Sequence, residues 1–137
     1  MTAVAVIVRD ALRHLKVQDP RQPVKAEDAR DAIHALNMMM RRWEADGLAL
    51  GWSDVATMDD ELPAPPEAEE AIGFNLAIKL RPGFGVTLDA DVIANAQSGL
   101  SSLTADVLSN QFVRTSYPDL PAGESQVCGD WREGYTR

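Results

Sequence analysis

Cysteine and histidine are scarce in this sequence of 137 residues, with Cys128 as the single cysteine and His14 and His34 as the two histidines. One cysteine cannot form a bridge within the chain, and no Cys/His spacing typical of a zinc site occurs. Neither histidine has a Ser, Cys or carboxylate at a spacing that suggests a catalytic triad. We therefore expect no metal, no cofactor and no enzymatic activity, and a reducing, intracellular site of assembly fits best.

Positive charge is also scarce, because 13 Lys and Arg residues stand against 21 Asp and Glu residues, which gives a net charge of -8. Non-specific binding to DNA comes mainly from cations that neutralise phosphates, so this balance argues against a sequence-independent nucleic-acid binder. A membrane span is not expected either, since no apolar run approaches the roughly 20 residues that a bilayer requires. With 45% hydrophobic residues, the chain has the size and composition of one domain with a single core.

Apolar residues at helical spacing predict four helices, at about residues 3–16, 25–46, 67–81 and 88–110. The predicted fold is all-α: an antiparallel four-helix bundle over residues 1–110, in which short connections make sequential helices neighbours. The β-branched run from Val4 to Val8 would also suit a short strand. Pro82, followed by Gly83 and Gly85, is expected to end the third helix, which its apolar residues predict to be central. Thr87 is expected to cap the fourth helix.

The stretch "MMMRRWEADGLALGW", residues 38–52, follows a continuous apolar seam on the second helix. Gly47 is expected to adopt the left-handed conformation that ends this helix. Met38 and Met39 flank the seam, so one of them is a candidate to face a neighbouring chain. Trp52 follows in a loop, where an aromatic side chain is less readily assigned to the core. The seam itself comprises Ala29, Ile33, Leu36, Met40 and Trp43.

Residues 53–66 contain three prolines, show no helical stripe and lead into the acids Glu67, Glu69 and Glu70. The simpler interpretation is a solvated loop followed by an acid-rich helix start. The alternative is a pair of carboxylates for glycoside hydrolysis. We predict a surface for a neighbouring subunit or for a tail component that comprises Met38, Arg41, Arg42, Trp52, Asp59, Asp60 and Glu61.

The segment from 111 to 137 loses the helical period and carries four aromatic residues that a core of this size does not require. Tyr and Trp dominate the energetics of protein interfaces, so we expect an extended C-terminal arm that docks on a partner. A disordered tail is the alternative, because segments this polar often remain unfolded. The predicted docking residues of the arm are Phe112, Arg114, Tyr117, Pro118, Trp131, Arg132 and Tyr135.

Two blocks make the sequence similar to a known family. The first is "ALNMMMRRWEADGLALGW", in which a helix ends as Trp-x-x-Asp-Gly, and the second is "NLAIKLRPGFG", followed by a helix that opens "DADVIANA". From about Arg9 to Tyr117 the chain resembles the head-to-tail adaptors of tailed bacteriophages. The similarity is greatest to the tail accessory, or packaged-DNA stabilisation, proteins of short-tailed phages.

The resemblance implies a structural protein of the virion neck that is assembled in the host cytoplasm. Neighbouring copies would form a ring, expected to be a dodecamer, beneath the portal protein once DNA is packaged. The ring would extend the channel, through which DNA passes without specific binding, and would offer a platform to a tail or nozzle protein below. The C-terminal arm would grip the portal, and anionic walls would suit a channel that must not retain DNA. The alternatives are a small carbohydrate-cleaving enzyme and a generic helical interaction module.

Overall fold

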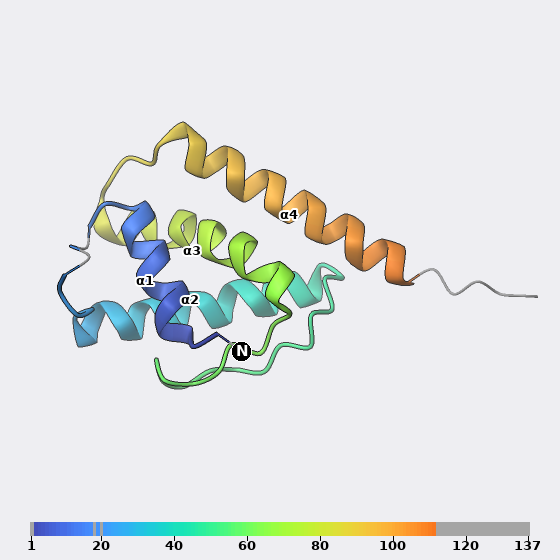
Figure 1. The fold of residues 1–137 in the computed structure, drawn as a ribbon, viewed down its shortest axis with the longest axis horizontal. Coiled ribbons are helices and arrows are strands. Elements are labelled where there is room, and N and C mark those ends of the chain that lie inside the picture. The colour runs from blue at the N-terminus through green and yellow to red at the C-terminus, as the bar shows by residue number, and fades with distance from the viewer. Residues whose placement is uncertain (1, 18, 20, 112–137) are drawn as a thin grey trace, which may run out of the picture.

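The computed structural model describes residues 2–17, 19 and 21–111, and these residues form four α-helices (Figure 1). Helix α1 spans Val4–His14, α2 spans Ala26–Ala45, α3 spans Glu69–Phe84 and α4 spans Ala90–Gln111. A short 3-10 helix, η1, covers Pro66–Ala68 and leads into α3. No strand occurs in the described part of the chain, where the β-type pairing is an isolated antiparallel bridge between Ala3 and Glu61. The predicted all-α fold is confirmed.

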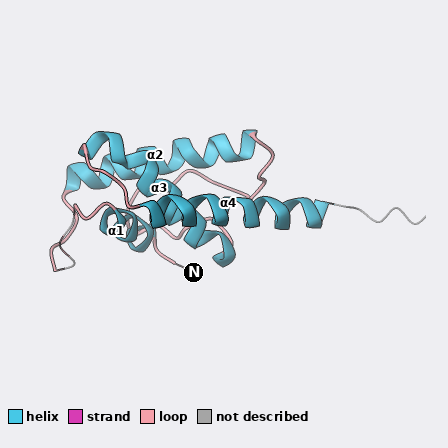
Figure 2. Cartoon of the chain, turned by 90° about the horizontal axis from the view of Figure 1, so that it is seen from above, coloured by secondary structure: helices cyan, strands magenta, loops and turns pink. Residues whose placement is uncertain are grey.

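Helix α3 is central, as predicted, because it contacts α1, α2 and α4. Helices α2, α3 and α4 alternate in direction, whereas α1 lies across them (Figures 1 and 2). The expectation that sequential helices are neighbours is wrong for α1, which packs mainly against α3 and only weakly against α2. The connection over residues 15–25 is long enough for α1 to lie against α3 and not beside α2. Helix α1 buries its apolar stripe there because α3 is more apolar than α2.

The core joins all four helices to the loop between α2 and α3, residues 46–65. Leu36, Met40 and Trp43 of the predicted seam are buried, while Ala29 and Ile33 are half-buried. No polar or charged side chain is buried among the described residues. The largest side chains that are fully enclosed are Val4, Val8, Leu12, Leu15, Leu36, Met40, Ile72 and Leu76.

Helices α3 and α4 are in close contact where Gly99 meets Ala71. A Cβ atom placed on Gly99 would lie 3.1 Å from the Ala71 Cβ and 3.2 Å from its Cα. One turn along α3, the Asn75 side-chain amide donates hydrogen bonds to the carbonyls of Ala71 (2.8 Å) and Ala96 (3.1 Å). This amide therefore links the two helices directly, and the small residues beside it allow the short separation.

Helix α2 ends as predicted, at a left-handed glycine. Gly47 has φ 98°, its N–H donates to the Glu44 carbonyl at 3.0 Å, and the Leu48 N–H donates to the Trp43 carbonyl at 2.9 Å. These two bonds form a Schellman motif. Helix α1 ends in the same motif, but Lys16 occupies the left-handed position with φ 57°, a conformation that costs a side-chain-bearing residue roughly 1–2 kcal/mol.

Two predicted helix boundaries are wrong. Helix α3 continues through Pro82 to Phe84 and ends at Gly85, whose φ is 63°. Proline removes one backbone hydrogen bond and its ring crowds the carbonyl four residues earlier, but a helix that is already near its last turn can still continue to a better end signal. Helix α4 begins at Ala90, and Asp89 directly precedes it, so Thr87 is not the capping residue. The Asp89 carbonyl accepts the Val92 N–H at 3.1 Å.

Candidate interaction surfaces

One face of α2 holds the α2–α3 loop, and its residues are spaced four and three positions apart. The Asn37 side-chain amide donates to the Val55 carbonyl at 2.9 Å, and its oxygen accepts the Val55 N–H at 3.1 Å. One turn later, the Arg41 guanidinium forms a two-pronged ion pair with Asp54. At the end of the helix, the Glu44 carboxylate accepts a hydrogen bond from the backbone N–H of Trp52 at 2.8 Å. Three positions of one helix face therefore fix the loop that carries Trp52.

The Arg41–Asp54 pair changes the ionisation of both groups. The hydrogen bond and the charge of Asp54 raise the pKa of Arg41. The hydrogen bond from Arg41 lowers the pKa of the Asp54 carboxyl, desolvation partly opposes this, and the indole of Trp52 adds a smaller lowering. Both side chains remain exposed to solvent, so the pair positions the loop more than it stabilises the fold. Arg41 thus already has a partner within its own chain.

Trp52 is half-buried and packs against the core, so it is less exposed than its place in a loop suggested. Its buried indole Nε1 has no hydrogen-bond partner of normal geometry within the described residues. An unsatisfied buried donor reduces the stabilisation that the ring contributes. Only part of this side chain is therefore open to a partner.

Asp60 closes a tight turn inside the α2–α3 loop. Its carboxylate accepts hydrogen bonds from the Ala56 and Thr57 N–H groups, both at 2.8 Å, and from the Thr57 hydroxyl at 2.7 Å. The backbone and side-chain bonds from Thr57, followed by the bond from Ala56, lower the pKa of the Asp60 carboxyl. Its neighbours Asp59 and Glu61 are exposed. Of these three predicted interface acids, Asp60 has a clear structural role.

The same loop provides acceptors for the first turn of α1, which has no side-chain cap. The Val4 N–H donates to the Asp60 carbonyl and the Ala5 N–H to the Met58 carbonyl, each at 2.9 Å. On the other side of the Ala3–Glu61 bridge, the Leu62 N–H donates to the Thr2 carbonyl at 2.9 Å. The loop therefore replaces the capping residue that the sequence of α1 lacks.

The remaining predicted interface residues lie on a second face of α2. Met38 is 54% exposed, whereas Met39 is buried, so Met38 is the methionine of this pair that is available to a partner. Arg42 follows it by one turn and forms an exposed ion pair with Asp46 at 3.1 Å. The predicted set is thus divided between the loop with its bound Arg41 and this Met38–Arg42 face.

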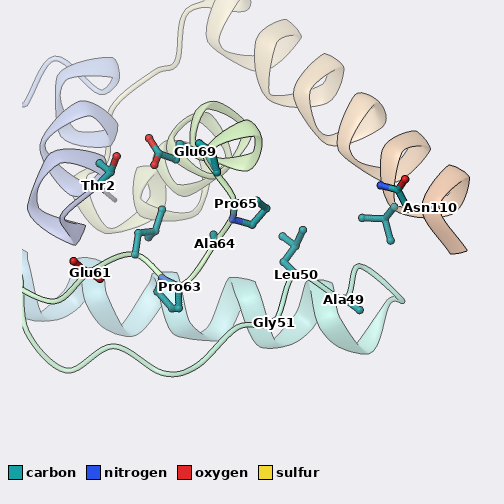
Figure 3. Close-up of a pocket in the computed structure, with 13 residues that line it drawn as sticks. Thr2, Ala49, Leu50, Gly51, Glu61, Pro63, Ala64, Pro65, Glu69 and Asn110 are labelled. Atoms are coloured by element: carbon teal, nitrogen blue, oxygen red, sulfur yellow. The ribbon is translucent and has the colours of Figure 1, made fainter.

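An apolar groove that the sequence did not predict lies between the α2–α3 loop and the last turns of α4 (Figure 3). It encloses about 1010 Å³. In the close-up, Leu50 and Pro65 lie on one side and Asn110 of α4 lies on the other. Its apolar walls come from Leu50, Gly51, Leu62, Pro63, Ala64, Pro65, Pro66 and Val107. The prolines of the loop were the only sign of the groove in the sequence. The wall that α4 contributes to the groove depends on the tertiary fold.

Residues that could support chemistry are dispersed. The described residues contain no group of three His, Cys, Asp or Glu side chains that could hold a metal ion. Glu67 and Glu70 are exposed near the start of α3, where the helix dipole favours acids. His14 stacks on Phe74, with ring centroids 4.3 Å apart, and His34 is exposed on α2. The positions of these acids and histidines therefore do not indicate a catalytic site.

The predicted arm began at residue 111, but Gln111 is the last residue of α4. Residues 112–137 lie outside the described residues, and they include Cys128 and all seven predicted docking residues: Phe112, Arg114, Tyr117, Pro118, Trp131, Arg132 and Tyr135. Within the described part, no helix is long and apolar enough to cross a membrane.

Comparison with protein families gives a match over most of the chain, including the two blocks described above. The sequence matches the model of the family described as P22 tail accessory factor over residues 2–131. That range extends beyond the described residues and includes most of the predicted arm. The chain belongs to the P22 tail accessory factor family, and it is a tail-associated structural protein of a bacteriophage virion.

Proposed function

We propose that the protein is a head-to-tail adaptor, several copies of which form a ring beneath the portal after DNA packaging. The ring extends the DNA channel and presents a platform to a tail or nozzle protein. The family match over residues 2–131 is the observation that carries this proposal. The expected copy number is twelve, as the resemblance to phage head-to-tail adaptors implies. The expected location is the head–tail junction.

The charge of the chain supports a place around DNA that does not retain it. The net charge is -8, so phosphates are repelled on average. Helix α4 contains Asp91 and Asp106 and no Lys or Arg over its whole length. A ring that turned the exposed side of α4 towards the channel would present no cation from this helix to the DNA.

The arm supplies the attachment in this proposal. Residues 112–137 follow α4 and carry Phe112, Tyr117, Trp131 and Tyr135, and aromatic anchors are the usual hot spots of interfaces. An arm that becomes ordered on binding has a low affinity for each subunit, but repetition around a ring multiplies the attachment. The Met38–Arg42 face and the loop that carries Trp52 are proposed for the contacts with neighbouring subunits or with the tail.

Electron microscopy of the purified protein mixed with portal rings of the same phage tests this function. We expect an added ring of density on the portal, and deletion of residues 116–137 should leave a soluble helical subunit that no longer attaches. Trp131→Ala and Tyr135→Ala should reduce occupancy more than the matched variant Arg132→Ala, because exposed ion pairs contribute only about 0–1 kcal/mol. Full occupancy with the truncated subunit would refute the role of the arm, and absence of any added density with the parent chain would refute the adaptor proposal.

A further inference from the structure

The apolar groove ends where the chain leaves α4. Val107 and Asn110 form its α4 wall, and Gln111 is the last residue of that helix. Successive Cα atoms are 3.8 Å apart, so the Cα of Phe112 must lie within about 8 Å of the Cα of Asn110. The 26 residues that follow α4 therefore begin at the rim of the groove.

The volume and lining of the groove fit a short apolar segment. Its 1010 Å³ is at the upper end of the range, about 300–1,000 Å³, of sites that enclose drug-sized ligands. The loop side presents Leu50, Leu62 and Pro65, whose side chains have no polar group.

The first residues beyond α4 have matching chemistry. Phe112, Val113 and Tyr117 supply apolar and aromatic side chains, and Arg114 supplies a positive charge between them. Glu61 and Glu69 line the groove, and neither carboxylate forms an ion pair with any residue in the described part of the chain.

We propose that this groove binds residues 112–120 of its own chain in the unassembled subunit. A tether that starts at the rim holds the segment at an effective concentration in the millimolar range, which a second copy in dilute solution does not reach. The chain need only reverse direction after Gln111, and closing so short a loop costs little entropy. The aromatic residues that begin the arm are then covered until a competing site is offered. This inference concerns the free subunit and does not depend on the portal role.

Cross-linking within the full-length free subunit tests the proposal. In a Cys128→Ser background, which removes the native thiol, Ala49→Cys places a thiol on the groove and Ser116→Cys places one in the segment. The matched control replaces Ala49→Cys by Ala105→Cys. Both alanines are exposed, and Ala105 does not line the groove. Two positions from Val107, it projects about 200° away around α4, on the side opposite the groove.

A short bismaleimide should join the groove pair within one chain about tenfold faster than the control pair, at a rate that does not depend on protein concentration. Position 105 lies on the helix that carries the arm and is 11 residues from position 116, whereas position 49 is 67 residues from it, so a free arm would not favour position 49. Adding Tyr117→Ala should slow the groove reaction about tenfold, since a buried aromatic side chain is lost, whereas Thr115→Ala should not. Equal rates for the two pairs would overturn the proposal. Products that join two chains in place of one would also overturn it, and would assign the groove to a second copy.

Discussion

The contact between Gly99 and Ala71 predicts opposite effects for the same substitution at two glycines. Gly99→Ala adds a Cβ that would lie 3.1–3.2 Å from the Ala71 Cβ and Cα, which is closer than packed carbon atoms normally approach. The atoms that must move belong to α3, including its backbone, so flexible side chains cannot relieve the contact. Overpacking of this kind typically costs about 1–3 kcal/mol.

Gly73 provides the matched control, because it lies inside α3 and an added Cβ would meet no atom within 4 Å. Gly73→Ala should therefore stabilise the protein by about 0.5–1 kcal/mol, the usual helix preference of alanine over glycine. Gly99→Ala receives the same gain, so the difference in unfolding free energy between the two variants isolates the steric cost. We expect Gly99→Ala to be less stable than Gly73→Ala by about 1–3 kcal/mol.

Urea unfolding followed by far-ultraviolet circular dichroism measures this difference, provided that the slope with urea is the same in both variants. If Gly99→Ala stabilised the protein as much as Gly73→Ala, the helices would not be in close contact at this point. A fall in stability for Gly73→Ala would show that the space around Gly73 is too small for an added Cβ atom.

Three further predictions concern stability. Trp43→Ala should cost about 3–5 kcal/mol, because the side chain is only 7% exposed; Trp52→Ala should cost less, and equal losses of melting temperature would refute the assignment of Trp43 to the core and Trp52 to its edge. Lys16→Gly should raise the unfolding free energy by about 0.5–1 kcal/mol, since it relieves a left-handed conformation at the cost of an exposed ion pair with Asp89; thermal unfolding that shows a loss would contradict this. Asp60→Asn should destabilise the chain at pH 7. Because the folded pKa of Asp60 is lowered, its contribution is present above the unfolded value of about 3.9 and is lost as pH falls through the folded value. The variant and the parent should therefore converge in acid, and a gap that stays constant down to pH 2 would exclude this origin.

The parts of the fold that could be predicted from the sequence follow from local patterns. The 3.6-residue period identified all four helices, and Gly47 marked the end of α2 because few other residues adopt positive φ without strain. Pro82 was a misleading signal, since its effect depends on how many turns remain after it. The position of α1 across the other helices depends on which apolar face α3 presents, and no local pattern encodes that choice.

The candidate surfaces were harder to predict, because their geometry joins segments that are distant in sequence. The helical seam left both Met38 and Met39 as candidates for an exposed position, and only the structure shows that Met38 is the exposed one. The engagement of Arg41 with Asp54 did not, because an arginine on a helix surface gives no sign of its partner. The groove needs Leu50, Pro65 and Val107 together, from three separate segments. Its apolar character could be suspected only from the proline-rich loop.

The attachment of α1 to the α2–α3 loop has a consequence for the order of folding during synthesis. Helix α1 leaves the ribosome before the other three helices, but an isolated helix of 11 residues is only marginally stable in water. The carbonyls of Met58 and Asp60 that accept its first N–H groups, and the helix α3 on which it packs, are made later. Roughly 70 residues separate the end of α1 from the end of α3, which at about 5–20 residues per second is several seconds of translation. The apolar stripe of α1 must therefore remain exposed until α3 emerges, and the first of the four helices to be synthesised is among the last to become stable.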